Sequence, residues 1–196
     1  MSSPAKVNFK LYQGSTFNEV LRWESSVKSY KPITAITKSA PVVITSAAHG
    51  IPVEWRVRFT NILGMTELNN SETYYKVTST TTNNITINDI NSLGFKEYVS
   101  GGVIEYNTPV DLTGYTARMQ MRAKIDDTTV IQELTTSNGG IIINNTNKTI
   151  TLNITADTTA AYTFSTAVYS LEMVSSGGQV IPFCNGTITL VKEVTR

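Results

Sequence analysis

The chain has 196 residues, a net charge of +1 and a charged fraction of only 16%. It has neither a block of like charges, as nucleic-acid binding requires, nor an apolar run long enough for a membrane span, so we expect neither partner. A single cysteine excludes an internal disulfide. Polarity comes mainly from Thr, which favours strands, and from Ser and Asn, which favour turns, and this composition favours an all-β fold.

The first predicted strands lie near the start of the chain. Val7, Phe9 and Leu11 alternate with polar residues, and residues 17–23 follow as a second run. A period of two places one set of side chains on a core face and the other in water, as in a strand. The first six residues lack the apolar core of a signal peptide, so we do not expect export.

Residues 32–107 have a different character. Short strands are expected at 42–45, 56–59, 74–78 and 85–87, and the segment contains the sole histidine, His49, and one of two tryptophans, Trp55. We interpret it as a small β domain inserted in an N-terminal loop of a host domain made of residues 1–31 and 108–196. Exposed loops tolerate such insertions because closing a longer loop costs little entropy.

The C-terminal part predicts a series of short strands. Ala117, Met119 and Met121 alternate with polar residues within 115–122, and further strands are expected at 130–134, 141–143, 148–154, 167–174, 179–184 and 187–194. Turns rich in Asn, Ser and Gly separate them, including Asn185-Gly186. Residues 155–162 are the one short helical segment, with Thr155 or Asp157 as its N-cap. The pattern is typical of an antiparallel β-sandwich.

Residues 109–122 (PVDLTGYTARMQMR) resemble a stretch common in phage structural proteins. Residues 9–17 (FKLYQGSTF), 169–174 (YSLEMV) and 186–190 (GTITL) continue the likeness. Together they resemble the Ig-like N-terminal domain of phage baseplate upper proteins, over residues 1–31 and 108–196. The resemblance implies an Ig-like antiparallel β-sandwich with a fixed place in a virion.

The inserted segment resembles a second module. Residues 46–50 (SAAHG), 56–59 (RVRF), 64–69 (GMTELN) and 100–102 (SGG) are similar to a β-barrel repeat of phage tail proteins. That repeat is likened to the first catalytic-cysteine half-domain of ubiquitin-activating enzymes. The likeness implies a small β-barrel without ubiquitin chemistry, because the insert contains no cysteine.

Several residues could carry chemistry, and each has a simpler structural interpretation. A metal site needs converging ligands, so the lone His49 favours a structural role beside a turn. Cys184 lies in an apolar stretch and favours a small buried hydrophobe over a nucleophile. Asp126 and Asp127 favour a solvated loop, and Asp89 with its neighbouring asparagines lacks the spacing of an EF-hand. We therefore predict no catalytic residue, no metal ligand and no cofactor.

Trp55 and Tyr98, with Tyr74-Tyr75, are the candidates for an aromatic platform that binds sugars. Aromatic side chains of a small barrel are more often part of its core, and this interpretation is favoured. Trp55 and Tyr98 are thus the only binding residues that the sequence suggests.

These observations favour a non-catalytic bacteriophage structural protein, a tail, baseplate or tail-connector component assembled in the host cytoplasm and located in the virion. Its expected partners are other phage structural proteins in a symmetric, oligomeric assembly, reached through edge strands. Two alternatives stay open. One is a head decoration or head-fibre protein on the capsid, and the other is a carbohydrate-binding receptor module that would lose glycan binding when Trp55 or Tyr98 becomes alanine.

Overall fold

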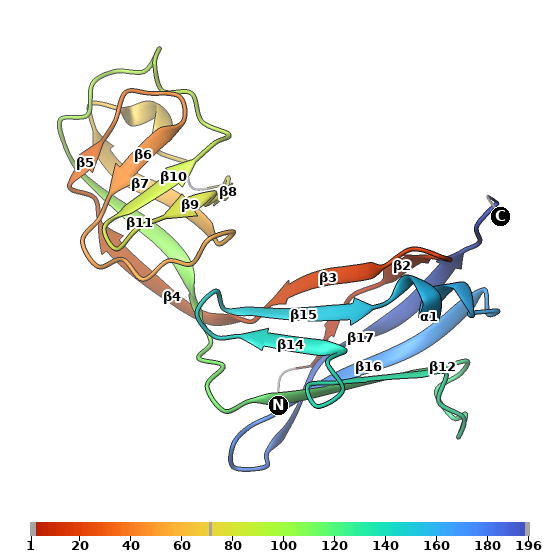
Figure 1. Ribbon diagram of the computed structural model, residues 1–196. Coiled ribbons are helices and arrows are strands. Elements are labelled where there is room, and N and C mark those ends of the chain that lie inside the picture. Colours follow the sequence, from red (N-terminus) through yellow and green to blue (C-terminus); the bar gives the residue numbers. More distant parts are fainter. Residues whose placement is uncertain (1–2, 71, 195–196) are drawn as a thin grey trace. The chain divides into compact units, whose positions relative to one another are not determined.

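The computed structural model describes residues 3–70 and 72–194, and it is almost entirely β (Figure 1). The chain divides into two compact units, Met1–Trp23 with Asp111–Arg196, and Glu24–Val110. The sequence predicts domain boundaries after residues 31 and 107. Each of these boundaries falls inside a strand, the first just before the last residue of its strand. Strand β4 (Glu24–Pro32) pairs antiparallel with β11 (Ser100–Pro109), so both belong to the second unit.

The first unit contains two sheets and one short helix. The larger sheet has the order β1-β17-β16-β12-β13, and β2 pairs with the same edge of β17. The smaller sheet has the order β14-β15-β3. The elements are β1 (Ala5–Lys6), β2 (Phe9–Tyr12), β3 (Phe17–Arg22), β12 (Thr116–Arg122), β13 (Gln132–Thr135), β14 (Ile141–Asn144), β15 (Thr149–Ile154), α1 (Ala156–Ala160), β16 (Thr166–Val174) and β17 (Val180–Val191).

The two sheets face each other as a sandwich whose core the period-two pattern predicts. Ala117, Met119 and Met121 of β12 are buried, and Ile150, Leu152 and Ile154 of β15 are buried from the other sheet. Phe9 meets Phe17 edge to face at 5.6 Å, which joins β2 to β3. Burial of each large apolar side chain contributes about 1.5–3 kcal/mol. The all-β prediction is therefore confirmed.

The short helix also forms where it is predicted. Thr155 is its N-cap, and its hydroxyl oxygen accepts a hydrogen bond of 3.3 Å from the backbone N–H of Thr158. Asp157, the alternative cap, lies in the first turn, where its charge is favourable beside the free N–H groups.

Asn185-Gly186 is not the predicted turn, because β17 runs through it as one strand of 12 residues. β1 and β2 both pair parallel with β17, on either side of Gly186, and Val7 lies between them. A Cβ at position 186 would collide with the carbonyl oxygen of Val7. The glycine therefore permits a close approach of two backbones within a strand, a second role that glycine has besides turns.

The second unit also contains two sheets, each of four strands, with the orders β5-β6-β10-β9 and β4-β11-β7-β8. Its remaining elements are β5 (Ala35–Ile36), β6 (Val42–Thr45), β7 (Arg56–Leu63), the 3₁₀ helix η1 (Thr66–Leu68), β8 (Tyr75–Lys76), β9 (Ser79–Thr80) and β10 (Asn84–Ile87). The strand expected at 74–78 is divided between β8 and β9. The chain changes sheets there, since Val77 N–H donates to Trp55 and Thr78 N–H donates to Thr86.

One hydrophobic core lies between these two sheets. It includes Val42 and Ile44 of β6, Val57 and Phe59 of β7, and Ile104 of β11. Among the described residues the strands do not close into the barrel expected from the sequence. The edge strands β5, β9, β4 and β8 each pair on one side only, which leaves two open sheets.

Candidate interaction surfaces

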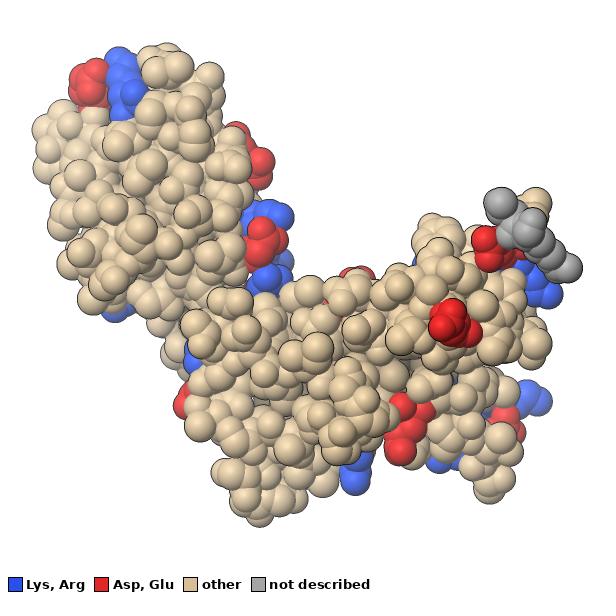
Figure 2. All heavy atoms as spheres, viewed as in Figure 1, with Lys and Arg blue, Asp and Glu red and all other residues tan. Residues whose placement is uncertain are grey.

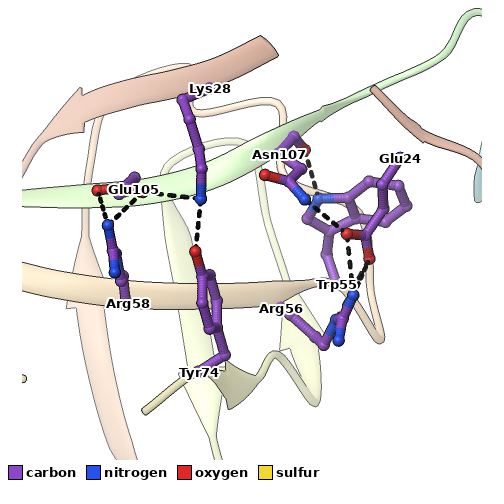
Figure 3. A network of polar contacts seen from close by, with 8 residues as sticks. All are labelled: Glu24, Lys28, Trp55, Arg56, Arg58, Tyr74, Glu105 and Asn107. Carbon is purple, nitrogen blue, oxygen red and sulfur yellow. Dashed lines mark hydrogen bonds and ion pairs between the residues drawn. The ribbon is translucent and has the colours of Figure 1, made fainter. Parts of the chain in front are cut away.

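A polar cluster lies on the outer face of sheet β4-β11-β7-β8, around Glu105 (Figure 3). Ile104 and Tyr106 of β11 point into the core, so Glu105 between them points to the opposite face. Its exposed fraction is nevertheless only 6%. Lys28 and Arg58 form ion pairs with its carboxylate on this face.

Two cations share the Glu105 carboxylate. Oε1 lies 2.9 Å from Lys28 Nζ and 2.8 Å from Arg58 Nη2, and Arg58 also donates to Oε2 at 2.8 Å. Lys28 donates to the Tyr74 hydroxyl, and both cations lie over the Tyr74 ring, at 5.1 and 5.4 Å from its centroid. Strands β4, β7 and β11 and the segment of Tyr74 are thereby joined.

The charge states follow from this geometry. Burial alone would raise the pKa of Glu105, but hydrogen bonds and charges from Lys28 and Arg58 outweigh it and hold the pKa below its ordinary value of 4.5. The hydrogen bond to Tyr74, then the one to Glu105, raises the pKa of Lys28. The hydrogen bond to Glu105 likewise raises the pKa of Arg58. All three groups are charged near neutral pH.

A second group of contacts lies beside the first (Figure 3). Arg56 Nη2 donates to both carboxylate oxygens of Glu24, at 3.1 and 3.0 Å. The side-chain amide Nδ2 of Asn107 donates to Glu24 Oε2 at 2.9 Å. The backbone carbonyl of Asn107 accepts a hydrogen bond of 2.8 Å from the indole N–H of Trp55. Each anion in Figure 3 is matched by a cation, so the cluster fastens strands together.

Trp55 and Tyr98, the candidate sugar-binding residues, lie in or against the core of the second unit. Trp55 is fully buried, so its ring offers no face to a sugar. Tyr98 is half-buried and packs on the same core, and its hydroxyl lies within hydrogen-bond distance of the carbonyl oxygens of Gly101 (2.9 Å) and Ile33 (3.2 Å). The favoured interpretation, core aromatics, matches this placement.

His49 and Cys184 are both buried and have structural partners. Ile51 N–H donates to His49 Nδ1 at 3.0 Å, so Nε2 bears the proton that faces the Asn84 carbonyl at 3.2 Å. The Tyr169 hydroxyl donates to the Val7 carbonyl at 2.8 Å and lies 3.7 Å from Cys184 Sγ, and burial raises the pKa of the Cys184 thiol. These contacts fit the structural roles expected from the sequence.

The acidic residues singled out in the sequence lie in turns. Asp127 accepts from the backbone N–H of Lys124 at 3.1 Å, within a loop. Asp111 accepts from Thr113, and hydrogen bonding by Asn145, Thr113 and Lys148 lowers the pKa of Asp111 to about 2. Its role is to fix the turn before β12.

Acidic, histidine and cysteine side chains do not gather in threes anywhere in residues 3–70 and 72–194. On the face shown in Figure 2, acidic and basic side chains lie singly or beside one another on a largely uncharged surface. Helices that could cross a membrane are absent from the described part of the chain.

The accessible features of both units are open sheet edges and exposed apolar side chains. β4 is nine residues long and, among the described residues, pairs only with β11; its Val27 and Tyr30 are 65% and 62% exposed. In the first unit, the edge strands β3 and β14 expose Val20 and Ile142. Unpaired strand edges are templates for pairing with another chain.

Residues 41–106 match the model of a family described as the ubiquitin-activating enzyme E1 FCCH domain. The match covers 66 of the 196 residues and lies within the second unit. No curated protein matches the chain. The matched segment contains no cysteine, since the only cysteine of the chain is Cys184.

Proposed function

We propose that the chain is a non-catalytic structural component of a bacteriophage particle that assembles through its sheet edges, in the tail, baseplate or tail-connector region. The observation that carries the proposal is the long open edge of β4, with Val27 and Tyr30 exposed. Such an edge offers backbone hydrogen bonds and apolar contacts to a strand of a neighbouring subunit. Its partners would be other virion proteins in a symmetric assembly.

Two further observations support this role. The stretch at 109–122 resembles phage structural proteins, and Asp111 and Leu112 within it hold a turn, with Leu112 buried and its N–H bonded to Asn145 at 2.8 Å. In the polar cluster, the carboxylate of Glu105 is neutralised by ion pairs with Lys28 and Arg58. These ion pairs join strands within the unit, and a rigid unit suits a role in assembly.

The test is quantitative mass spectrometry of purified particles separated into heads and tails. The proposal expects the chain in tails, at a low copy number set by tail symmetry. Enrichment in heads at capsid-like copy number would contradict the tail position and favour a decoration protein or head fibre. Absence from both fractions would overturn the virion role.

Edge variants test how the chain docks. Val27→Lys with Tyr30→Lys adds charge along β4, which we expect to reduce incorporation into particles without unfolding the chain, because both side chains are already exposed. The matched control is Leu63→Lys with Val99→Lys, which changes two exposed apolar residues (57% and 71%) outside β4. Equal incorporation of both double variants would exclude the β4 edge as the docking site.

A further inference from the structure

An open groove of about 480 Å³ lies on the outer face of the larger sheet of the first unit. The register of the strands places polar side chains across its floor. Gln120, Ser170, Asn185 and Lys6 lie opposite one another in one row across β12, β16, β17 and β1. The volume is in the range of sites that take a small ligand or a few side chains.

The next row contributes Arg122, Val168 and Thr187. Arg122 is half-buried, and its guanidinium donates to Gln120 Oε1 at 2.7 Å and to the backbone carbonyl of Asp127. Both acceptors are uncharged, and they fix the guanidinium in place while three of its five N–H groups remain for another partner.

The two cations of the groove have no carboxylate of their own. Within the described residues, neither Arg122 nor Lys6 lies within ion-pair distance of an acidic side chain. A third cation of the same face, Arg118, shows the contrast, because it pairs with Glu172 at 2.7 Å. Two positive charges of the first unit therefore line a groove whose lining holds no carboxylate, and the nearby Glu133 accepts a hydrogen bond of 2.8 Å from Gln120.

The groove also has apolar walls. Val168 lies in its floor, and Ile125 at its margin is 82% exposed. Gly186 contributes only its backbone to the lining. Methylene groups can pack on the apolar part while an anionic tip reaches the cations, an arrangement that suits a glutamate side chain better than a free inorganic anion.

We propose that this groove binds an acidic polypeptide segment, one carboxylate of which pairs with Arg122 and another with Lys6. The inference goes beyond the virion role and does not depend on it, since it concerns binding by the purified full chain. Arg122 is the stronger partner because its guanidinium is half-buried and held in place, whereas Lys6 is exposed.

The experiment is an NMR titration of the ¹⁵N-labelled full chain with a capped hexapeptide of alternating glutamate and leucine. The amide resonances of Ser170, Gly186 and Thr187 are expected to shift with the peptide. They should not shift with the same peptide carrying glutamine in place of glutamate. Inorganic phosphate is titrated in a third experiment. If phosphate bound as tightly as the peptide, the groove would be a general anion site and the polypeptide proposal would be wrong.

Variants locate the site. Arg122→Gln is expected to weaken binding roughly ten- to hundredfold, as expected for a hydrogen-bonded charge. Lys6→Gln should weaken it roughly two- to fivefold, as for an exposed pair. The matched control is Lys10→Gln, which removes the same charge from the exposed side of the neighbouring strand β2, outside the groove, and should leave binding unchanged.

Ser170→Asp is a second variant that tests the site without changing Arg122, in case Arg122→Gln does not fold. Ser170 is exposed and lies opposite Gln120, whose side chain holds the Arg122 guanidinium, so an aspartate at position 170 would pair with Arg122 and abolish peptide binding. The proposal is overturned if the three amides do not respond to millimolar peptide, or if Arg122→Gln and Ser170→Asp bind as the parent chain does.

Discussion

Glu105 shows how one residue is determined by side chains far away in the sequence. It lies in an alternating stretch between Ile104 and Tyr106, so its position on an outer face follows from periodicity. Its burial does not, because Lys28 and Arg58 come from two other strands. A buried carboxylate is stable as an anion only when cations and hydrogen bonds replace water.

We predict that Glu105→Gln lowers the free energy of unfolding by about 1–2 kcal/mol, because it leaves two partly buried cations without their anion. Urea denaturation measures this change. The matched control is Glu97→Gln, which removes the partner of Lys38 from a pair whose acidic side chain is 76% exposed, and it should change stability by less than about 0.5 kcal/mol. Equal effects of the two variants would contradict the stabilising role of the ion pairs of Glu105.

The same carboxylate predicts a pH dependence. The pKa of Glu105 lies below 4.5 in the folded chain, so its ion pairs stabilise the fold above about pH 4.5, and this contribution is lost as the pH falls through the folded pKa. Between neutral pH and pH 3, the unfolding free energy of the parent chain should therefore fall more than that of Glu105→Gln. Parallel pH profiles would show that Glu105 is not a source of acid sensitivity.

Among the strands, β17 depends most on a contact that is distant in sequence. Gly186→Ala is predicted to destabilise the first unit by about 1–3 kcal/mol, since a Cβ would meet the Val7 carbonyl and lie 2.8 Å from Asn8 Oδ1. Gly177→Ala is the matched control, because its Cβ would meet only Ser175 Oγ at 3.8 Å. Thermal denaturation compares the two, and a neutral Gly186→Ala would mean that β1 can move away without cost.

The elements that the sequence predicts best are those whose own residues determine them. β12, β15 and β16 follow from strict alternation, and α1 follows from its Thr155 cap. β4 and β11 were not predicted as strands. Gly101-Gly102 resembles a domain end but lies inside β11, where Gly102 (φ 95°) leaves space for Ile62 and Ile33. Pairing between residues about 80 positions apart has no local signature.

The same limit applies to the candidate surfaces. The Glu105 cluster and the groove around Arg122 bring together residues from three or more strands, and each residue alone resembles a scattered surface charge. Trp55 and Tyr98 are candidates for sugar binding because they are aromatic. Their burial depends on the core that surrounds them, which their own residue types do not determine. Charge neutralisation and burial are properties of the assembled sheet.

At the scale of the whole molecule, each unit has its own core and one tryptophan. Trp23 packs edge to face on Tyr115 (5.6 Å) and Phe183 (5.5 Å) in the first unit, while Trp55 is buried in the second. Labelling with 5-fluorotryptophan therefore gives one ¹⁹F resonance for each unit, and Trp23→Phe assigns them. A urea titration of the labelled chain follows both units in the same sample.

We predict that Glu105→Gln lowers the urea midpoint of the Trp55 resonance by roughly 0.5–1 M and leaves that of Trp23 in place. Gly186→Ala should do the reverse, because its clash with Val7 lies in the unit of Trp23. This outcome is expected if two cores unfold as separate cooperative units. If either variant moved both midpoints equally, the chain would unfold as one unit, and its two cores would depend on each other for stability.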